Sequence, residues 1–401
     1  MRKTVLVLGS NFGGLTAALA VKRELHGDVE VKVISPGDRF VFNPSLIWLP
    51  FGKRDASQIT FPVAPTFEAH GIDFIHDAAV EIDADQQRVR TASGTDHAYD
   101  YLVVATGYRN QMDVVPGLTE NAHTITTLEA AQRTGEAWKR YLAYPGDIVI
   151  AASQGAGCFG AAYEFLFNTS YRLKKAGLQK QVKLTYVSSE PFLGHFGIGG
   201  LPHGEQLLGM FLRKQNIDAH VGVALDHVAS DAVVLADGTE LPSSFSMVIP
   251  PFLGQEVAAS ATALDPDAKG YLPVRGTYQS EKFDNVYVVG IAAQVVAPWQ
   301  TAIPMGIPKT GLPTEIQAHT AASNIAAQIR GERPTHEKPF ADIPAVCVMD
   351  AGNNGVIILA DKMLPPRDRG VLVPGPQAHA MKLAFEKYFL WKARHGYVQL
   401  P

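Results

Sequence analysis

Two cysteines are the residues of this chain that most directly indicate chemistry. The 401 residues contain only Cys158 and Cys347. Cys158 lies inside a glycine-rich turn in which Gly155, Gly157 and Gly160 form the pattern G-x-G-x-x-G, directly after a short apolar run. This pattern between a strand and a helix is typical of a dinucleotide-binding unit. A thiol at the mouth of such a turn indicates redox chemistry beside a cofactor.

The second cysteine lies in an extended apolar run between Pro344 and Gly352. Two cysteines are too few for a secreted disulfide scaffold. Cysteines in enzymes are commonly buried and unreactive, so two free structural thiols are the alternative to a redox pair. The position of Cys158 in a turn, rather than within a helix, favours reactivity.

Another glycine-rich turn follows the first predicted strand. Gly9 and Gly14 keep the register of a dinucleotide-binding turn, with Gly13 beside them, while Asn11 replaces the second glycine. The helix that begins here would direct free N–H groups and the positive end of its dipole at a pyrophosphate. The next strand ends at Ser35, so a hydroxyl replaces the usual ribose-binding acid. We interpret this turn as an FAD site, with another nucleotide or none as the alternative.

An NAD(P)H site is the alternative for the turn that carries Cys158. The strand after it ends at Ser188 and Ser189 without an acid, and Cys158 places sulfur where a nicotinamide would pass. The missing acid does not decide the matter, because the N-terminal turn lacks one too.

The order of predicted elements indicates an α/β protein with two tandem Rossmann-like dinucleotide-binding domains and a C-terminal amphipathic helical segment. Helices are predicted at residues 14–25, 160–175 and 377–394, and strands at 29–34 and 182–188. We assign residues 1–110 and 275–335 to a discontinuous FAD domain, 111–274 to the second domain, and 336–401 to the C-terminal region. A predicted strand that ends at Gly290 returns the chain to the FAD domain, and Ala105, Thr106 and Gly107 form a small-residue turn there.

Composition limits the classes of partner. The net charge of -4 and the absence of long basic runs argue against nucleic acid. No apolar run reaches the ~20 residues that cross a bilayer. The apolar residues after Met1 are a strand rather than a signal peptide. No metal site is predicted.

The predicted C-terminal helix is amphipathic. One face is predicted to carry Met381, Ala384, Phe385, Tyr388, Phe389 and Lys392, and Lys382, Glu386 and Lys387 are predicted to project elsewhere. Core packing is the ordinary explanation of such an aromatic face. Contact with a lipid surface is the alternative, with Trp391, Lys392 and Arg394 at the interface.

Four segments, residues 154–164, 189–200, 304–311 and 385–392, strongly resemble sulfide:quinone oxidoreductases. The resemblance covers nearly the whole chain and implies that Cys158 and Cys347 face the flavin, bridged by a disulfide or by extra sulfur atoms. It implies oxidation of sulfide to enzyme-bound persulfide or polysulfide, with electrons passing through FAD to a membrane quinone. The family's third cysteine would fall near residues 125–127 and is absent, so we expect non-covalent FAD.

The resemblance also supplies candidate site residues. Glu164 and His195 are candidate acid or base groups, although a helical glutamate is more often solvated and a lone histidine more often structural. Further FAD-binding candidates are Pro44, Ser45, Gly290, Lys309, Thr310 and Gly311. The predicted quinone contacts are Phe385, Tyr388, Phe389 and Val346.

Three other functions stay open at this point. A flavocytochrome c-type sulfide dehydrogenase shares the paired cysteines, a type II NADH:quinone reductase shares the terminal helix, and a sulfur-carrying flavin scaffold needs no turnover. The expected partners are sulfide, a membrane quinone and a bilayer surface of a prokaryotic cell. A homo-oligomer remains open, as does the membrane face.

Overall fold

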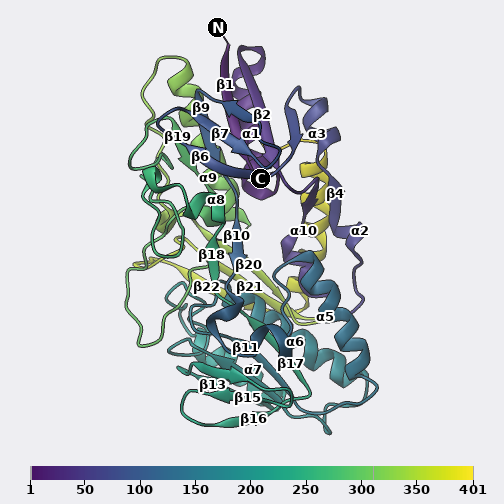
Figure 1. The fold of residues 1–401 in the computed structure, drawn as a ribbon. Helices are drawn as coiled ribbons and strands as arrows, with labels where there is room; N and C mark the ends of the chain where they lie inside the picture. Colours follow the sequence, from purple (N-terminus) through teal and green to yellow (C-terminus); the bar gives the residue numbers. More distant parts are fainter. Residues whose placement is uncertain (1, 310, 401) are drawn as a thin grey trace.

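The computed structural model describes residues 2–309 and 311–400. Its first layer is a parallel sheet in the order β19-β9-β1-β2-β5 (Figure 1). The strands are β1 (Lys3–Leu8), β2 (Val29–Ser35), β5 (Asp73–His76), β9 (Tyr101–Val104) and β19 (Val286–Val288). Helix α1 (Phe12–Leu25) follows β1 and packs along α9 (Leu312–Ile329). Because β19 pairs with β9, a segment from late in the chain completes the first sheet.

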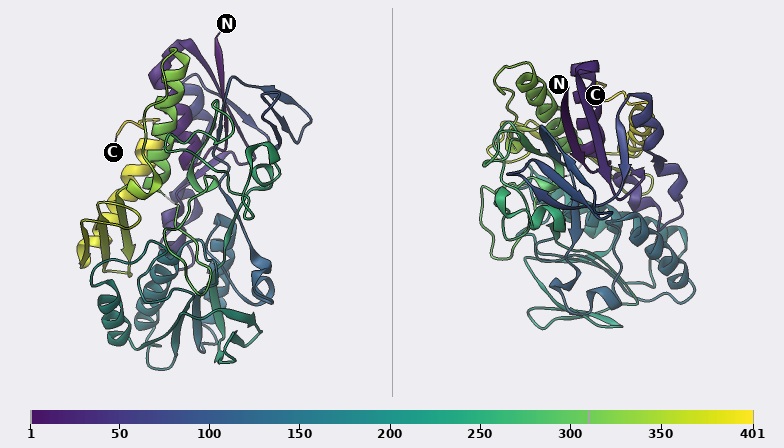
Figure 2. Two further views of the ribbon diagram at one scale, coloured as in Figure 1. Left: turned by 90° about the vertical axis from the view of Figure 1, so that its left-hand side faces the viewer. Right: turned by 45° about the horizontal axis from the view of Figure 1, so that its top comes forward.

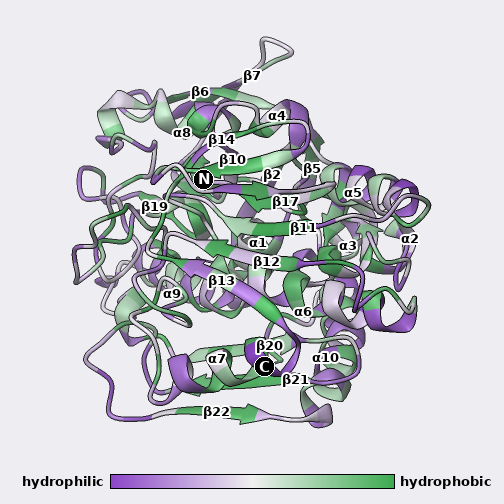
Figure 3. Cartoon of the chain, turned by 90° about the horizontal axis from the view of Figure 1, so that it is seen from below, coloured by the Kyte–Doolittle hydropathy of each residue, from purple (hydrophilic) through white to green (hydrophobic). Residues whose placement is uncertain are grey.

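A second parallel sheet has the order β13-β12-β11-β17. Its strands are β11 (Ile148–Ala152), β12 (Leu184–Ser188), β13 (Ile217–Val221) and β17 (Phe245–Ile249), and its helices are α5 (Leu128–Tyr141), α6 (Phe159–Lys175) and α7 (Gly204–Lys214). Every residue of β11, β12 and β17 is buried, and Figure 3 shows hydrophobic residues in these central strands. Continuous apolar strands are expected where helices or loops cover both faces of a parallel sheet.

The C-terminal region contains a three-stranded antiparallel sheet, β20 (Ala345–Asp350), β21 (Gly355–Ala360) and β22 (Gly370–Pro374). Helix α10 (Pro376–Arg394) follows and packs on β20 and β21. Figure 2 shows this unit along one side of the molecule, beside both parallel sheets. The sequence predicted an extended run around Cys347 and the helix, but not the other two strands.

The remaining elements are shorter connections and edge structures. They are η1 (His26–Asp28), β3 (Arg39–Val41), η2 (Asn43–Trp48), α2 (Ala56–Ile59), β4 (Thr60–Pro62), α3 (Ala64–Ala69), β6 (Ala79–Asp83), β7 (Arg88–Thr91), β8 (Asp96–Ala98), β10 (Tyr108–Asn110), η3 (Met112–Val114), α4 (Leu118–Asn121), β14 (Leu225–Val228), β15 (Ala232–Leu235), β16 (Glu240–Pro242), β18 (Phe252–Gly254), α8 (Glu256–Ala259), η4 (Thr262–Leu264), η5 (Gly290–Ala292) and η6 (Phe340–Asp342).

The predicted fold class of two Rossmann-like units plus a C-terminal helical segment is confirmed. The predicted helices agree with α1, α6 and α10 to within two residues at each end. Helix ends are the least certain part of any sequence-based prediction, because capping and the first turn depend on tertiary contacts.

Candidate active site

The N-terminal glycine turn packs directly against the turn after β9. Gly9 has a φ of +104°, and a Cβ there would lie 2.4 Å from the carbonyl oxygen of Ala105. A Cβ on Gly14 would lie 1.8 Å from the carbonyl oxygen of Gly9. Only glycine fits at these two positions, because the first needs a positive φ and both need close backbone approach.

The start of α9 closes the same site. Cβ atoms on Gly13 and Gly290 would lie 3.2 Å and 3.1 Å from Thr314 in the first turn of α9. The N-termini of α1 and α9 therefore meet at the carboxyl ends of β1 and β19, where two helix dipoles favour a negatively charged group.

Two buried polar atoms at this cradle lack a hydrogen-bond partner. Among the described residues they are Asn11 Oδ1 and Thr106 Oγ1. An unpaired buried polar group is costly, so such groups usually meet a ligand or water. The glycine contacts and these atoms together fit a bound nucleotide.

The predicted cofactor contacts Ser35 and Ser45 form hydrogen bonds within the protein. Ser35 Oγ is buried and bonds to Ser10 Oγ at 2.9 Å and to the N–H of Gly37 at 3.3 Å. Ser45 follows Pro44 in η2, and its hydroxyl donates to the carboxylate of Glu386.

The ammonium of Lys309 is hydrogen-bonded within the protein, beside Gly290 of the cradle. It donates to the carbonyl oxygens of Ile291 and Ala293, at 2.7 Å each, and lies 3.4 Å from the ring centre of Tyr271. Burial lowers its pKa to about 7. Gly107 has a φ of +74° in the turn after β9. Gly311 is the residue before α9, and Thr310 lies outside the described residues.

Both cysteines are free thiols in this structure. Cys158 immediately precedes α6, and Cys347 lies within β20. Burial raises the pKa of Cys158, and the charge of Glu164 raises it further. The Cys347 residue is partly accessible to solvent. Many protein atoms nevertheless surround its thiol, and the resulting desolvation raises its pKa to about 12. Glu164 and Cys158 also contribute to that rise, so the two thiols and Glu164 lie in one neighbourhood.

Glu164 forms a buried ion pair with a residue of the C-terminal helix. The ammonium of Lys382 contacts its carboxylate, and the backbone N–H of Asp350 donates to Oε1 at 2.8 Å. Burial raises the pKa of Glu164, an effect that Lys382 opposes. The pair therefore joins α6, which begins at Cys158, to α10 and to β20, which carries Cys347.

Asp350 is the centre of a wider charge cluster. Its carboxylate accepts hydrogen bonds from Trp48 Nε1 at 2.8 Å and His379 Nδ1 at 2.5 Å. Lys53 Nζ lies 3.6 Å away and also sits 4.0 Å from the ring centre of Trp48. Burial opposes ionisation of Asp350, but these partners lower its pKa below the usual value. The cluster fixes the start of α10 against β20 and η2.

Part of the predicted aromatic face of the C-terminal helix is exposed, and three charged side chains of the helix are buried. Met381 and Phe385 are each 40% exposed, whereas Lys382, Glu386 and Lys392 are each 3% exposed. A buried charge is stable only with a partner, and each of these three has one.

The partners come from three separate segments. Lys382 pairs with Glu164, Glu386 with Arg54 at 2.8 Å, and Lys392 with Glu315 at 3.0 Å. Because sequence pattern alone does not show these partners, the sequence did not predict that these charged side chains are buried.

The aromatic residues of α10 divide between core and surface. Phe389 is 2% exposed, and its ring lies 4.9 Å from that of Phe12 at the cofactor turn and 5.3 Å from that of Phe42. Phe389 is therefore part of the core, so the core-packing explanation of the aromatic face holds for this residue and the lipid-contact alternative does not. Phe385 is exposed and contacts the edge of this cluster, with ring centres 6.0 Å from Phe42. Tyr388 is half-buried.

His195 is buried in the loop that follows β12. Its ring packs edge-on against Trp299 at 5.0 Å and Phe192 at 5.2 Å, and its Nδ1 has no hydrogen-bond partner. Burial lowers its pKa to about 4. Within the described chain no hydrogen bond joins this imidazole to either thiol.

The second glycine turn makes its hydrogen bonds within the protein. The N–H of Gly155 donates to the carbonyl of Pro304 at 2.6 Å, and that of Gly157 to the carbonyl of Pro250 at 3.1 Å. A Cβ on Gly157 would lie 2.1 Å from the ring of Phe252. These N–H groups are directed at the protein rather than at a pyrophosphate.

An acid that the sequence reasoning missed lies two residues after β12. Glu190 is fully buried, and the hydroxyls of Tyr163, Tyr186 and Ser188 donate to its Oε2 at 2.9, 3.1 and 2.8 Å. The N–H of Phe196 donates to Oε1 at 2.7 Å. Burial raises its pKa to about 7. This acid is bound inside the protein rather than presented to a ribose.

Lys382 and Asp350 were also missed. The spacing of Ala378, Lys382, Glu386, Phe389 and Ala393 matches one helix face. Reading that row as the buried face, despite its charges, would have found Lys382. Asp350 has no comparable signal, because its partners come from three separate segments.

Comparison with known proteins identifies the family of this chain. The model of the pyridine nucleotide-disulphide oxidoreductase family matches residues 3–306. The sulfide-quinone reductase of Aquifex aeolicus is 37% identical over 99% of this chain and 92% of its own. The chain belongs to the sulfide:quinone oxidoreductase family.

A solved structure and two more distant relatives agree with this family. The solved structure of the Aquifex aeolicus enzyme superposes with a TM-score of 0.94, covering 98% of this chain and 92% of that one. A mitochondrial sulfide:quinone oxidoreductase of Dictyostelium discoideum is 24% identical over 71% of this chain and 64% of its own length. A type II NADH:quinone oxidoreductase of Staphylococcus aureus is 24% identical over 90% of both chains. The chain is an oxidoreductase of the sulfide:quinone family.

Proposed function

We propose that this enzyme oxidises sulfide at Cys158 and Cys347 and passes two electrons through FAD to a membrane quinone. The observation that carries the proposal is the shared neighbourhood of both thiols and the Glu164–Lys382 pair, in a chain 37% identical to a sulfide-quinone reductase. Bound at the cradle of α1 and α9, FAD would supply an acceptor for two electrons and a donor to quinone.

The N-terminal turn would hold the FAD pyrophosphate. Its support is the positive end of α1, the close approach of Gly9 and Gly14, and the unpaired Asn11 Oδ1 and Thr106 Oγ1. No cysteine lies near residues 125–127, the place of the family's third cysteine. Non-covalent binding of FAD is therefore part of the proposal.

The sulfur step follows from thiol–disulfide chemistry. Hydrosulfide attacks one sulfur of an oxidised Cys158–Cys347 bridge, the bridging S–S bond breaks, and one cysteine becomes a persulfide while the other leaves as thiolate. Burial disfavours a thiolate at both positions. The ammonium of Lys382 opposes the rise of both pKa values and so partly offsets the cost of the released charge.

Glu164 is positioned to handle the proton of sulfide. Burial raises its pKa above the usual value of a carboxyl group, and a shifted pKa of this kind is typical of a residue that acts as an acid or base. Lys382 opposes that rise and keeps the carboxylate available. His195 has no comparable contact, so we propose that it shapes the glycine-rich loop rather than transferring protons.

Contact with the quinone and the membrane is proposed for the exposed side of the C-terminal unit. No helix within the described residues is long and apolar enough to cross a bilayer. Large apolar side chains are instead exposed on neighbouring elements, namely Val346, Leu359, Val371, Met381, Phe385 and Trp391. An apolar patch of this kind is typical of a surface that meets lipid or a partner. Phe385 and Val346 would contact the quinone at the edge of this apolar patch.

NADH is the main competing electron donor, because NADH:quinone oxidoreductases are relatives. The hydrogen bonds within the second glycine turn and the buried Glu190 argue against it. We propose that the second Rossmann-like unit does not bind NADH and instead positions Cys158. We also propose the domain division 1–110 with 275–335, 111–274 and 336–401, which the pairing of β19 with β9 supports.

The direct test is steady-state reduction of a soluble quinone analogue by the purified protein with sulfide or NADH as donor. Turnover with sulfide and none with NADH is the expected result. Turnover with NADH alone would identify the protein as an NADH:quinone reductase, and no turnover with either donor would favour a sulfur-carrying scaffold.

A further inference from the structure

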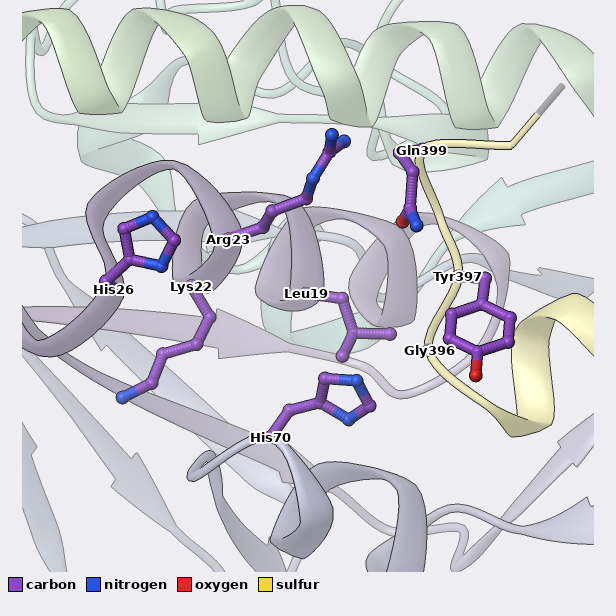
Figure 4. Close-up of a pocket in the computed structure, with 8 residues that line it drawn as sticks. All are labelled: Leu19, Lys22, Arg23, His26, His70, Gly396, Tyr397 and Gln399. Carbon is purple, nitrogen blue, oxygen red and sulfur yellow. The ribbon is translucent and has the colours of Figure 1, made fainter.

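Two cavities lie side by side where α10 ends and share one wall, His70. The first has a volume of about 420 Å³ and lies between the last turn of α1, the end of α3 and the C-terminal tail. Figure 4 shows Lys22, Arg23, His26, His70, Tyr397 and Gln399 around it, with Leu19 between them. The second has a volume of about 510 Å³ and is lined by Arg39, Phe61, Pro62, Arg394 and His395 among others.

The charged side chains that line these cavities are all basic. Four lysine or arginine side chains, Lys22, Arg23, Arg39 and Arg394, line them together with three histidines, and no aspartate or glutamate does. In residues 2–309 and 311–400 none of the four cations forms an ion pair. The whole chain carries a net charge of -4, so this is a local concentration of unpaired positive charge.

A hydrogen bond and close packing hold His70, the residue that lines both cavities, in place. His70 Nδ1 bonds to the carbonyl of Thr66 at 2.8 Å, and because a carbonyl only accepts, Nδ1 carries the hydrogen and leaves Nε2 free. A Cβ on Gly396 would lie 2.3 Å from this ring, so the tail packs tightly on it. Thr66 also donates to the carbonyl of Arg394 at 2.8 Å. These contacts hold basic groups of α3 and α10 in fixed relative positions.

Aromatic side chains accompany the basic groups. Trp391 is 46% exposed and Tyr397 is 39% exposed, with ring centres 5.3 Å apart and His395 5.7 Å from each. Arg394 lies 5.5 Å from the ring centre of Phe61. Tryptophan and tyrosine beside arginine are typical of the headgroup layer of a bilayer. Trp391 lies on the same helix as the exposed side chains of Met381 and Phe385.

We propose that the paired cavities bind the phosphate of an anionic phospholipid and orient the enzyme on the membrane. Arginine and lysine form charge-assisted hydrogen bonds to phosphate oxygens, and Leu19, Phe61 and Pro62 supply apolar surface for the glycerol and upper acyl chain. The proposal rests on the membrane contact proposed above. It adds a lipid class and a site that are distinct from the thiols and the cofactor cradle.

The test compares flotation of the purified holoenzyme with vesicles of phosphatidylcholine alone and vesicles that also contain phosphatidylglycerol. The variant is Arg23→Gln/Arg394→Gln. The matched control, Arg213→Gln/Lys214→Gln, removes the same charge from exposed positions at the end of α7. We expect the wild type to prefer phosphatidylglycerol and the variant to lose that preference, roughly 25-fold for two cations. The control should keep it, and phosphatidylcholine binding and sulfide-dependent flavin reduction should not change in either.

Three results would overturn the proposal. Equal wild-type binding to both vesicles would overturn the phosphate site alone, and so would equal losses in the variant and the control. Binding to neither vesicle would overturn the membrane contact and this site with it. A soluble arm uses glycerol phosphate: if it stabilises the wild type against heat while the wild type binds both vesicles equally, the ligand is a free phosphate ester and not a lipid.

Discussion

Replacing Lys382 with methionine tests whether a buried ion pair joins the sulfur site to the C-terminal helix. The change keeps the length of the side chain but leaves Glu164 without its cation, and the two side chains are only 4% and 11% exposed. Removing one partner of a buried pair typically costs ~3 to 5 kcal/mol of unfolding free energy. Glu164 keeps the N–H of Asp350 and can also take up a proton, so we expect the lower end, ~3 kcal/mol, near pH 8.

The pH dependence of that loss identifies its cause. Burial raises the pKa of Glu164, and loss of Lys382 would raise it further above the unfolded value of about 4.3. The folded variant then binds a proton that the unfolded chain releases. The loss should therefore be smallest below about pH 4.3 and should grow as pH rises through the raised pKa.

Urea unfolding of Lys382→Met measures the loss, with Lys387→Met as the control. Lys387 is exposed on the same helix, and its loss should change stability by less than ~0.5 kcal/mol. Adding Glu164→Gln to Lys382→Met should restore much of the stability, because it removes the unpaired charge. Equal stability of the two methionine variants, or a loss that does not change with pH, would refute the reasoning.

Three further predictions follow from other contacts. Cys158→Ser and Cys347→Ser should each abolish sulfide-dependent flavin bleaching in stopped flow while the protein stays yellow after gel filtration; bleaching at the wild-type rate in either would exclude a two-cysteine relay. Phe389→Ala should lower unfolding free energy by ~3 to 5 kcal/mol, whereas Phe385→Ala should cost far less but raise the quinone KM, and the reverse order would show that the exposed ring is not at the quinone. The pKa of Glu190 is raised to about 7, so its contribution to the unfolding free energy is full below about pH 4.3 and is lost as pH rises through 7. In urea titrations, Glu190→Gln should reduce this pH dependence of the unfolding free energy by about 3 kcal/mol. An unchanged pH profile in the variant would contradict this prediction.

The local pattern of the sequence was sufficient to predict the two Rossmann-like units. Gly9, Gly14 and the buried strands follow from backbone geometry and apolar runs, which act over a few residues. The same reasoning predicted that Cys158 precedes a helix and that Cys347 lies in a strand.

The orientation of α10 could not be predicted in the same way. Amphipathicity places apolar residues inward, but here Lys382, Glu386 and Lys392 are inward because partners 218, 332 and 77 residues away neutralise them. A short pattern carries no record of such distant partners. Strands β21 and β22 were missed for a related reason, since their pairing depends on β20 and on the helix that covers them.

The central claim is that sulfide, through the two cysteines, is the source of electrons for the flavin. An anaerobic titration of the purified yellow protein, followed by flavin absorbance, tests it most directly. The account predicts that sulfide bleaches the flavin and that NADH does not, because the second glycine turn is hydrogen-bonded within the protein. Rapid bleaching by NADH with none by sulfide would contradict it.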